Sequence, residues 1–122
     1  IENTTDVEVY LMDKIGDQSS EHLLAIYLDG SNGVLGSQTI GKGSISNVQL
    51  EPRSIVQMGI IINARAVILA HNHPSGKAEA TEEDKKATRD LEQQLSEFNI
   101  ELLDHLIVTG DDTHSLRREG IL

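Results

Sequence analysis

Apolar side chains recur at helical spacing in two parts of the chain. Residues 7–15 and 81–97 carry them every three or four positions, which predicts two amphipathic helices. In the second of these, Leu91, Leu95 and Phe98 mark the side that we expect to be buried. Each helix therefore needs an apolar surface to pack against.

Continuous apolar runs bounded by turn residues predict the strands. Residues 66–70, Ala-Val-Ile-Leu-Ala, fit a strand that is buried on both faces of a sheet. Residues 29–33, Asp-Gly-Ser-Asn-Gly, are the clearest turn signal and join strands at 22–28 and 34–43 into a hairpin. Pro52 suits the first turn of a further helix.

The order of these elements predicts the fold class. A further strand is expected at 100–108, and a short strand or loop follows the turn at 110–112. Helices that alternate with strands in this way are typical of an α/β domain with three α/β/α layers around a mixed sheet. At 122 residues, the chain has room for a single domain over 1–122. Because it begins at Ile1 rather than Met, we expect it to be part of a longer protein.

Composition narrows the possible chemistry. The chain has no Cys, so any metal must be bound by His and carboxylate side chains. No apolar run reaches the roughly 18–20 residues of a membrane span and no signal peptide is visible, so we expect a cytoplasmic protein with no membrane partner. The formal charge of −10 repels a phosphate backbone and disfavours direct nucleic-acid binding. Lys85, Lys86 and Arg89 form the best basic group, but a solvated helix face explains them as well.

Candidate ligands for a metal ion follow the buried strand directly. Residues 71–76 read His-Asn-His-Pro-Ser-Gly. Side chains two apart on a strand point to the same face, so His71 and His73 can converge on one point. Asp84, in the first turn of the next helix, can project toward this loop. Two imidazoles and a carboxylate are a ligand set of catalytic zinc, which keeps one position for water.

Each of these features has a simpler interpretation by itself. A lone His-x-His is more often a polar turn than a metal site, and Thr81-x-x-Asp84 also resembles a capping box. Asp104 and His105 lie on a predicted strand, where His105 fits either a satisfied core histidine or a residue that contacts the metal ligands. Ser75 is better explained as a turn residue than as a nucleophile, since nothing orients a base toward it. A zinc deaminase is disfavoured, because its Pro-Cys-x-x-Cys motif is absent.

The combined spacing resembles a known family. The two histidines, the threonine, the aspartate and an earlier glutamate are similar to the pattern of JAMM (MPN-type) zinc metallopeptidases. Three longer strings resemble its RadC branch, bacterial proteins named for DNA repair: residues 71–76, 104–108 and 115–120. The resemblance covers nearly the whole chain, and it implies a three-layer α/β/α fold with a cytidine-deaminase-like core.

The resemblance also implies roles for individual residues. It assigns His71, His73 and Asp84 as zinc ligands, and Glu21 as the residue that holds and deprotonates the attacking water. Thr81 stands where the wider family has Ser, whose hydroxyl helps to stabilise the oxyanion. Without the resemblance, Glu21 would be one surface glutamate among many.

The implied function is zinc-dependent hydrolysis of a peptide or isopeptide amide. The alternative is a non-catalytic zinc-binding interaction domain that docks protein or DNA-processing partners. An intact Glu21 favours catalysis, since a docking domain has no need of a water-activating residue. For a role in DNA repair, the resemblance implies that DNA contacts lie in a preceding N-terminal part, which in the family resembles a helix-hairpin-helix module. The sequence identifies neither the peptide or protein substrate nor the oligomeric state.

Overall fold

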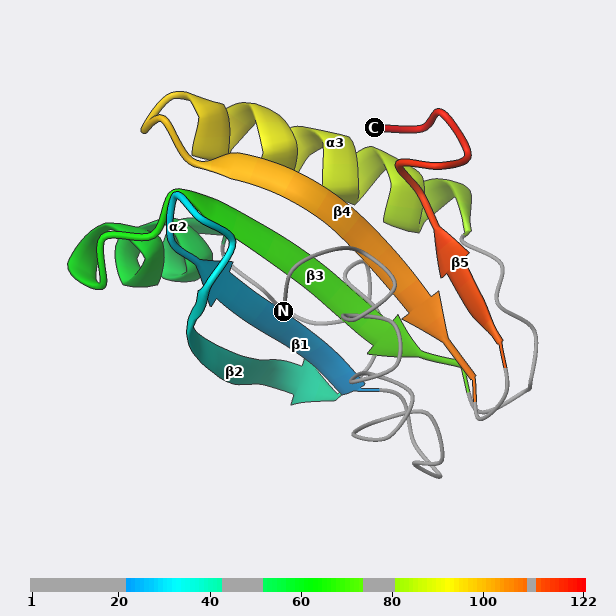
Figure 1. The fold of residues 1–122 in the computed structure, drawn as a ribbon. Helices are drawn as coiled ribbons and strands as arrows, with labels where there is room; N and C mark the ends of the chain where they lie inside the picture. Colours follow the sequence, from blue (N-terminus) through cyan, green and yellow to red (C-terminus); the bar gives the residue numbers. More distant parts are fainter. Residues whose placement is uncertain (1–21, 43–51, 74–80, 110–111) are drawn as a thin grey trace.

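The protein is built around a mixed five-stranded sheet (Figure 1). The computed structural model describes residues 22–42, 52–73, 81–109 and 112–122. The elements in chain order are β1 (His22–Leu28), β2 (Val34–Lys42), α2 (Pro52–Ile61), β3 (Ala66–Asn72), α3 (Glu82–Ser96), β4 (Glu101–Val108) and β5 (Thr113–Ser115). The strand order is β2-β1-β3-β4-β5, with β3 and β4 parallel and the other neighbours antiparallel. The predicted α/β fold with a mixed sheet is confirmed.

The predicted hairpin is formed by β1, β2 and the turn between them. The Asp29 carboxylate accepts hydrogen bonds from the backbone N–H groups of Ser31 and Gly33, at 2.8 and 2.9 Å. Asn32 takes a left-handed backbone conformation with φ of 62°, which asparagine tolerates better than most residues. The turn signal in the sequence therefore describes the local structure correctly.

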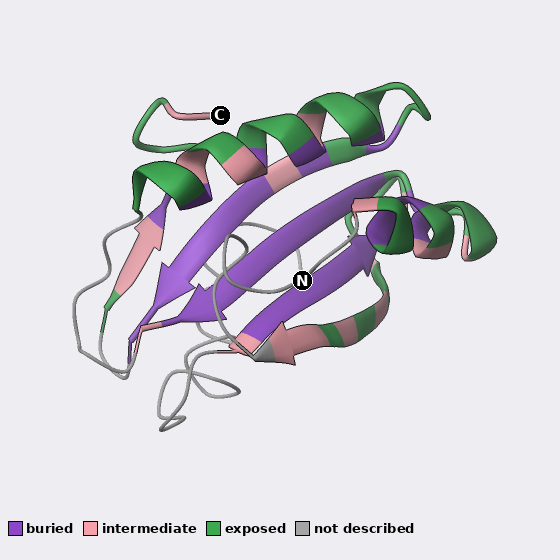
Figure 2. Cartoon of the chain, turned by 180° about the vertical axis from the view of Figure 1, so that it is seen from behind, coloured by how far each residue is buried: buried purple, intermediate pink, exposed green. Residues whose placement is uncertain are grey.

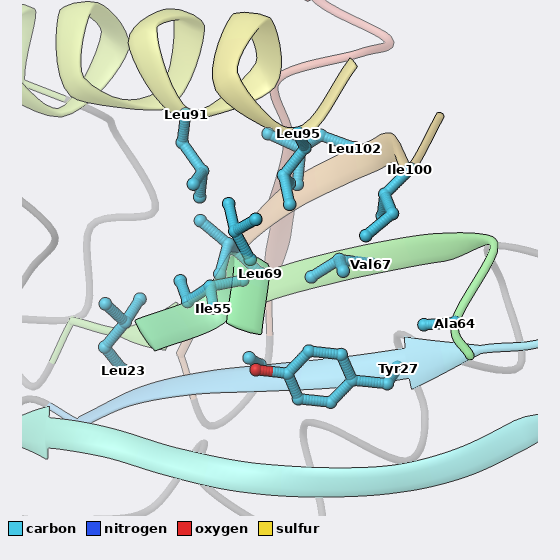
Figure 3. Packing of buried hydrophobic residues seen from close by; sticks show 12 residues of the cluster. Leu23, Tyr27, Ile55, Ala64, Val67, Leu69, Leu91, Leu95, Ile100 and Leu102 are labelled. Atoms are coloured by element: carbon cyan, nitrogen blue, oxygen red, sulfur yellow. The ribbon is translucent and has the colours of Figure 1, made fainter. Parts of the chain in front are cut away.

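Both described helices cover one face of the sheet. Alternate side chains of β1 and β3, including Leu23, Tyr27 and Leu69, form a core with Ile55 of α2 and Leu91 of α3 (Figure 3). The other side chains of the same strands form a second buried cluster on the opposite face. Strands β1 and β3 are accordingly buried along nearly their whole length (Figure 2). The helix expected over 7–15, which would supply a third layer, lies outside the described residues.

The buried side of α3 differs from the expected one. Leu91 and Leu95 are buried as predicted, and Asp84 and Thr88 continue their line toward the start of the helix. The prediction for Phe98 is wrong, since its side chain is 52% exposed. The helix ends at Ser96, and the turn that follows takes Phe98 off the helical stripe. None of the helices in the described ranges is long and apolar enough to cross a membrane.

Strand β4 contains an irregularity that changes which way its side chains point. Val67 of β3 is paired with Leu102, but the next residue, Ile68, is paired with Asp104. One extra residue in a strand reverses the alternation of the side chains that follow it. Leu102 and His105 therefore face the same side of the sheet, toward α3.

The C-terminal segment holds this bulge. The Arg117 guanidinium donates to the backbone carbonyls of Leu102 and Leu103, both at 2.7 Å. The Asp104 carboxylate accepts from the backbone N–H of the next residue at 2.8 Å, from that of Arg117 at 3.0 Å, and from the Ser115 hydroxyl. Two of the strings noted in the sequence, 104–108 and 115–120, thus meet at one structural feature.

Candidate metal centre

The two histidines of the His-x-His motif converge at the carboxyl end of β3. The backbone N–H of His73 donates to the carbonyl of Val108 at 2.9 Å, which keeps His73 alongside β4 after β3 has ended. The chain therefore stays extended, and both rings point to the same side. The Nε2 atoms of His71 and His73 lie 2.8 Å apart.

Asp84 completes this group from the first turn of α3. One possible ligand atom from each of His71, His73 and Asp84 lies within 4.8 Å of the others. His71 and Asp84 are fully buried, and His73 is partly exposed. The structure thus brings together the three residues that the sequence indicates as metal ligands.

The start of α3 holds the Asp84 side chain in place. The backbone N–H of Asp84 donates to the Thr81 hydroxyl at 3.1 Å, and the backbone N–H of Thr81 lies 3.4 Å from the Asp84 carboxylate. This is a capping box, so the simpler interpretation of Thr81-x-x-Asp84 is confirmed. It does not compete with metal binding, because the cap fixes the carboxylate beside the histidines.

Replacing Thr81 with alanine should lower the free energy of unfolding by about 1 kcal/mol, because the N-cap acceptor is lost. Thr81→Ser keeps the hydroxyl and should retain most of the stability. Urea denaturation of the metal-free protein measures both values. Equal midpoints for Thr81→Ala and wild type would show that this cap adds nothing to stability.

The buried histidines are held neutral. Burial, together with the neighbouring His105 and His73 rings, lowers the pKa of His71 far below its usual range, and the Asp84 charge opposes this shift. Burial also lowers the pKa of His105 to about 4. Both rings are therefore neutral near pH 7. A neutral imidazole is the form whose nitrogen lone pair can bind a metal.

His105 contacts a candidate ligand directly. Its Nε2 atom lies 2.8 Å from Nδ1 of His71, and its Nδ1 atom lies 2.7 Å from the hydroxyl of Thr88 on α3. Both interpretations that the sequence left open for His105 describe it: it is a buried histidine with two ring partners, and one of them is the candidate ligand His71. Thr88 was missed by the sequence analysis. The available signal was its position one helical turn after Asp84, where a polar residue interrupts a buried stripe.

Comparison with known proteins agrees with this geometry. The family model described as the RadC-like JAB domain matches residues 1–121. The chain belongs to this family. The residues that match the RadC-like JAB family include the whole sheet and the His-His-Asp cluster.

Curated relatives of this RadC-like domain come from several bacteria. A UPF0758 protein of Burkholderia ambifaria is 38% identical over 122 residues, which are 100% of this chain and 47% of the relative. UPF0758 proteins of Bordetella petrii and Chlorobium chlorochromatii are 38% and 36% identical, over 95% and 96% of this chain and 52% and 53% of their own lengths. This RadC-like domain thus spans about half the length of these relatives, and their names state no activity.

Two residues considered for the site of this RadC-like domain, Glu21 and Ser75, lie outside the described residues. The residue after Glu21 is described. The backbone N–H of His22 donates to the Asn72 side chain at 2.7 Å, and Leu23 is paired with His71. The first residue of β1 therefore lies beside the end of β3 that carries the histidines.

Proposed function

We propose that this RadC-like JAB domain is a zinc-dependent hydrolase of the JAMM type that cleaves a peptide or isopeptide amide. The observation that carries the proposal is the convergence of His71, His73 and Asp84 at the carboxyl end of a buried strand. Crevices at strand ends are where α/β sheets commonly bind ligands. Family membership supports the reaction type, because this ligand set belongs to the pattern of the JAMM metallopeptidases.

The donor set fits zinc better than magnesium or calcium. His71 and His73 offer imidazole nitrogens, whereas magnesium and calcium favour sites made only of oxygen ligands. Asp84 adds one carboxylate, so three residues would hold the ion and would leave a position for water, as in catalytic zinc sites. When bound, zinc acts as a Lewis acid and lowers the pKa of a coordinated water to about 7.

In this proposal Glu21 accepts and donates the protons that move during hydrolysis. Its carboxylate takes a proton from the attacking water and passes it to the nitrogen of the leaving amine. The assignment rests on the resemblance to the JAMM pattern, and it is supported by the contact of the adjacent His22 with Asn72. This contact brings the beginning of β1 to the strand end where His71 lies.

Thr81 can cap α3 and also donate to a substrate. Its hydroxyl oxygen accepts the hydrogen bond from the backbone of Asp84, which uses an oxygen lone pair. The hydroxyl hydrogen is a separate donor. We propose that it stabilises the negative charge that develops on the substrate carbonyl oxygen, as an oxyanion-hole donor does.

Replacing Glu21 with glutamine tests the proposed reaction. Zinc-loaded full-length protein is incubated with a fluorogenic peptide library and with a lysine isopeptide, and zinc content is measured on the same samples. We expect Glu21→Gln to keep its zinc and to lose about 10²–10⁴-fold in hydrolysis rate, the usual contribution of a general base. Glu101→Gln, on the exposed first residue of β4, is the matched control and should behave as wild type.

Two outcomes would contradict this proposal. Equal hydrolysis by Glu21→Gln and wild type would exclude Glu21 as the proton carrier. A wild-type protein that binds zinc but cleaves no amide in either probe set would favour the zinc-binding interaction domain instead.

A further inference from the structure

A line of buried polar groups connects α3, β4 and β3 beneath the candidate metal centre. The Thr88 hydroxyl lies 2.6 Å from the backbone carbonyl of Asp84 and 2.7 Å from Nδ1 of His105. Nε2 of His105 lies 2.8 Å from Nδ1 of His71. All four residues are fully buried. Buried polar groups of this kind must satisfy one another, because little water reaches them.

The chemistry of these groups gives each hydrogen bond a direction. The backbone carbonyl of Asp84 can only accept, so the single hydroxyl hydrogen of Thr88 points toward it. The Thr88 oxygen must then act as the acceptor toward His105. It follows that Nδ1 of His105 carries the hydrogen and donates to Thr88.

The same reasoning determines the tautomer of His71. A neutral imidazole has one N–H group and one lone pair, so Nε2 of His105 is an acceptor once its Nδ1 is a donor. Nδ1 of His71 therefore carries the hydrogen that is donated to His105. This leaves the lone pair of His71 on Nε2, the atom that lies 2.8 Å from Nε2 of His73.

We propose that Thr88 and His105 are positioning residues that hold His71 in its Nδ1–H tautomer and aim its Nε2 lone pair at the metal. The inference rests on the metal centre proposed above and adds to it the two residues that orient His71, one of its two fully buried ligands. Thr88 also donates to the backbone of Asp84, so its hydroxyl is linked directly to one candidate ligand and through His105 to another, His71.

The bulge in β4 is an independent observation that supports this role. In a regular strand, side chains alternate between the two faces of the sheet, so His105 would lie on the face opposite to Leu102. The bulge between them puts both side chains on the same face. Arg117 and Asp104 hold the bulge with several hydrogen bonds. Bulges that re-aim a side chain are found preferentially beside functional sites. A histidine that only filled space would not need a bulge to turn it toward Thr88 and His71.

The test compares variants that keep or remove each hydrogen bond. Thr88→Val removes the hydroxyl with little change in shape, Thr88→Ser retains it, and His105→Phe removes both ring nitrogens. Zinc affinity is measured by competition with a chelator in the full chain. We expect His105→Phe and Thr88→Val to bind zinc about 10–100-fold more weakly, as is usual when a partner of a ligating histidine is lost. Thr88→Ser should bind zinc as wild type does.

A second readout does not require the metal. Nitrogen-15 NMR of the imidazoles in metal-free protein reports the tautomer of each histidine. We expect His71 to be in the Nδ1–H form in wild type and Thr88→Ser, and in a mixture of tautomers in His105→Phe. Leu91→Ala is the structural control, because it weakens the core beside α3 without touching these hydrogen bonds. It should leave the His71 tautomer unchanged.

The outcomes separate this inference from the proposed function. Wild-type zinc affinity and an unchanged His71 tautomer in both Thr88→Val and His105→Phe would overturn the positioning role. Absence of zinc from folded wild-type protein under metal-replete conditions would overturn the metal centre. In that case the tautomer measurement still decides whether Thr88 and His105 orient His71. If His105→Phe fails to fold, the Thr88→Val and Thr88→Ser pair carries the test.

Discussion

The His73→Ala variant is expected to fold and to lose the zinc that wild-type protein retains at close to one ion per chain. His73 lies just after β3 and is only partly buried, so its removal leaves the core intact. The two remaining candidate ligands would hold zinc at least ~100-fold more weakly, since even loss of a residue that merely supports a ligand costs 10–100-fold. Metal analysis after dialysis measures the loss.

Thermal unfolding provides a second measure of the same change. Zinc at about 100 times its Kd should stabilise wild type by about 2.7 kcal/mol and should have little effect on His73→Ala. A chelator should reverse the stabilisation of wild type. His114→Ala is the matched control, because His114 lies on β5 beside Glu119 and outside the candidate centre. Wild type that folds but takes up no zinc from metal-replete buffer would exclude the site.

Among substitutions of polar residues, Asp104→Ala is expected to cause the largest loss in the free energy of unfolding. Asp104 is 4% exposed and accepts hydrogen bonds from the backbone of His105 and Arg117 and from the Ser115 hydroxyl. Removal of the carboxylate leaves these donors without their acceptor. Each donor that stays buried then costs about 1–3 kcal/mol of stability. We expect a loss of about 3 kcal/mol or more in the free energy of unfolding.

Urea denaturation of metal-free protein measures this loss. Asp90→Ala is the control, because Asp90 lies on the exposed side of α3 and pairs only with the exposed Lys86 in the described contacts. It should change stability by no more than about 0.5 kcal/mol. Asp104→Ala should also weaken zinc binding, since the bulge aims His105 at His71. Similar urea midpoints for the two variants would show that the bulge does not depend on Asp104.

Much of the fold was predictable because its signals are local. The turn at residues 29–33 and the unbroken apolar run of β3 each identify an element without reference to the rest of the chain. The prediction for Phe98 was wrong because helical periodicity was extended past the point where α3 ends. A periodic pattern indicates which side of a helix is buried, but it does not indicate where the chain leaves the helix.

The candidate ligands were predictable for the same reason. His71 and His73 are two residues apart on one extended segment, and Asp84 lies in a capped first turn. Backbone geometry over a few residues determines where each of these side chains points. Glu21 is different, since only its resemblance to a family pattern indicates it.

The sequence by itself determined the α/β elements, the burial of β3 on both faces of the sheet, and the ligand spacing at its end. Only the tertiary structure decided that His105 faces His71. That direction depends on one extra residue in β4, whose pairing with β3 and whose contacts with Arg117 join parts of the chain far apart in sequence. A one-residue shift moves a side chain to the opposite face of a sheet, and spacing along one strand cannot reveal it.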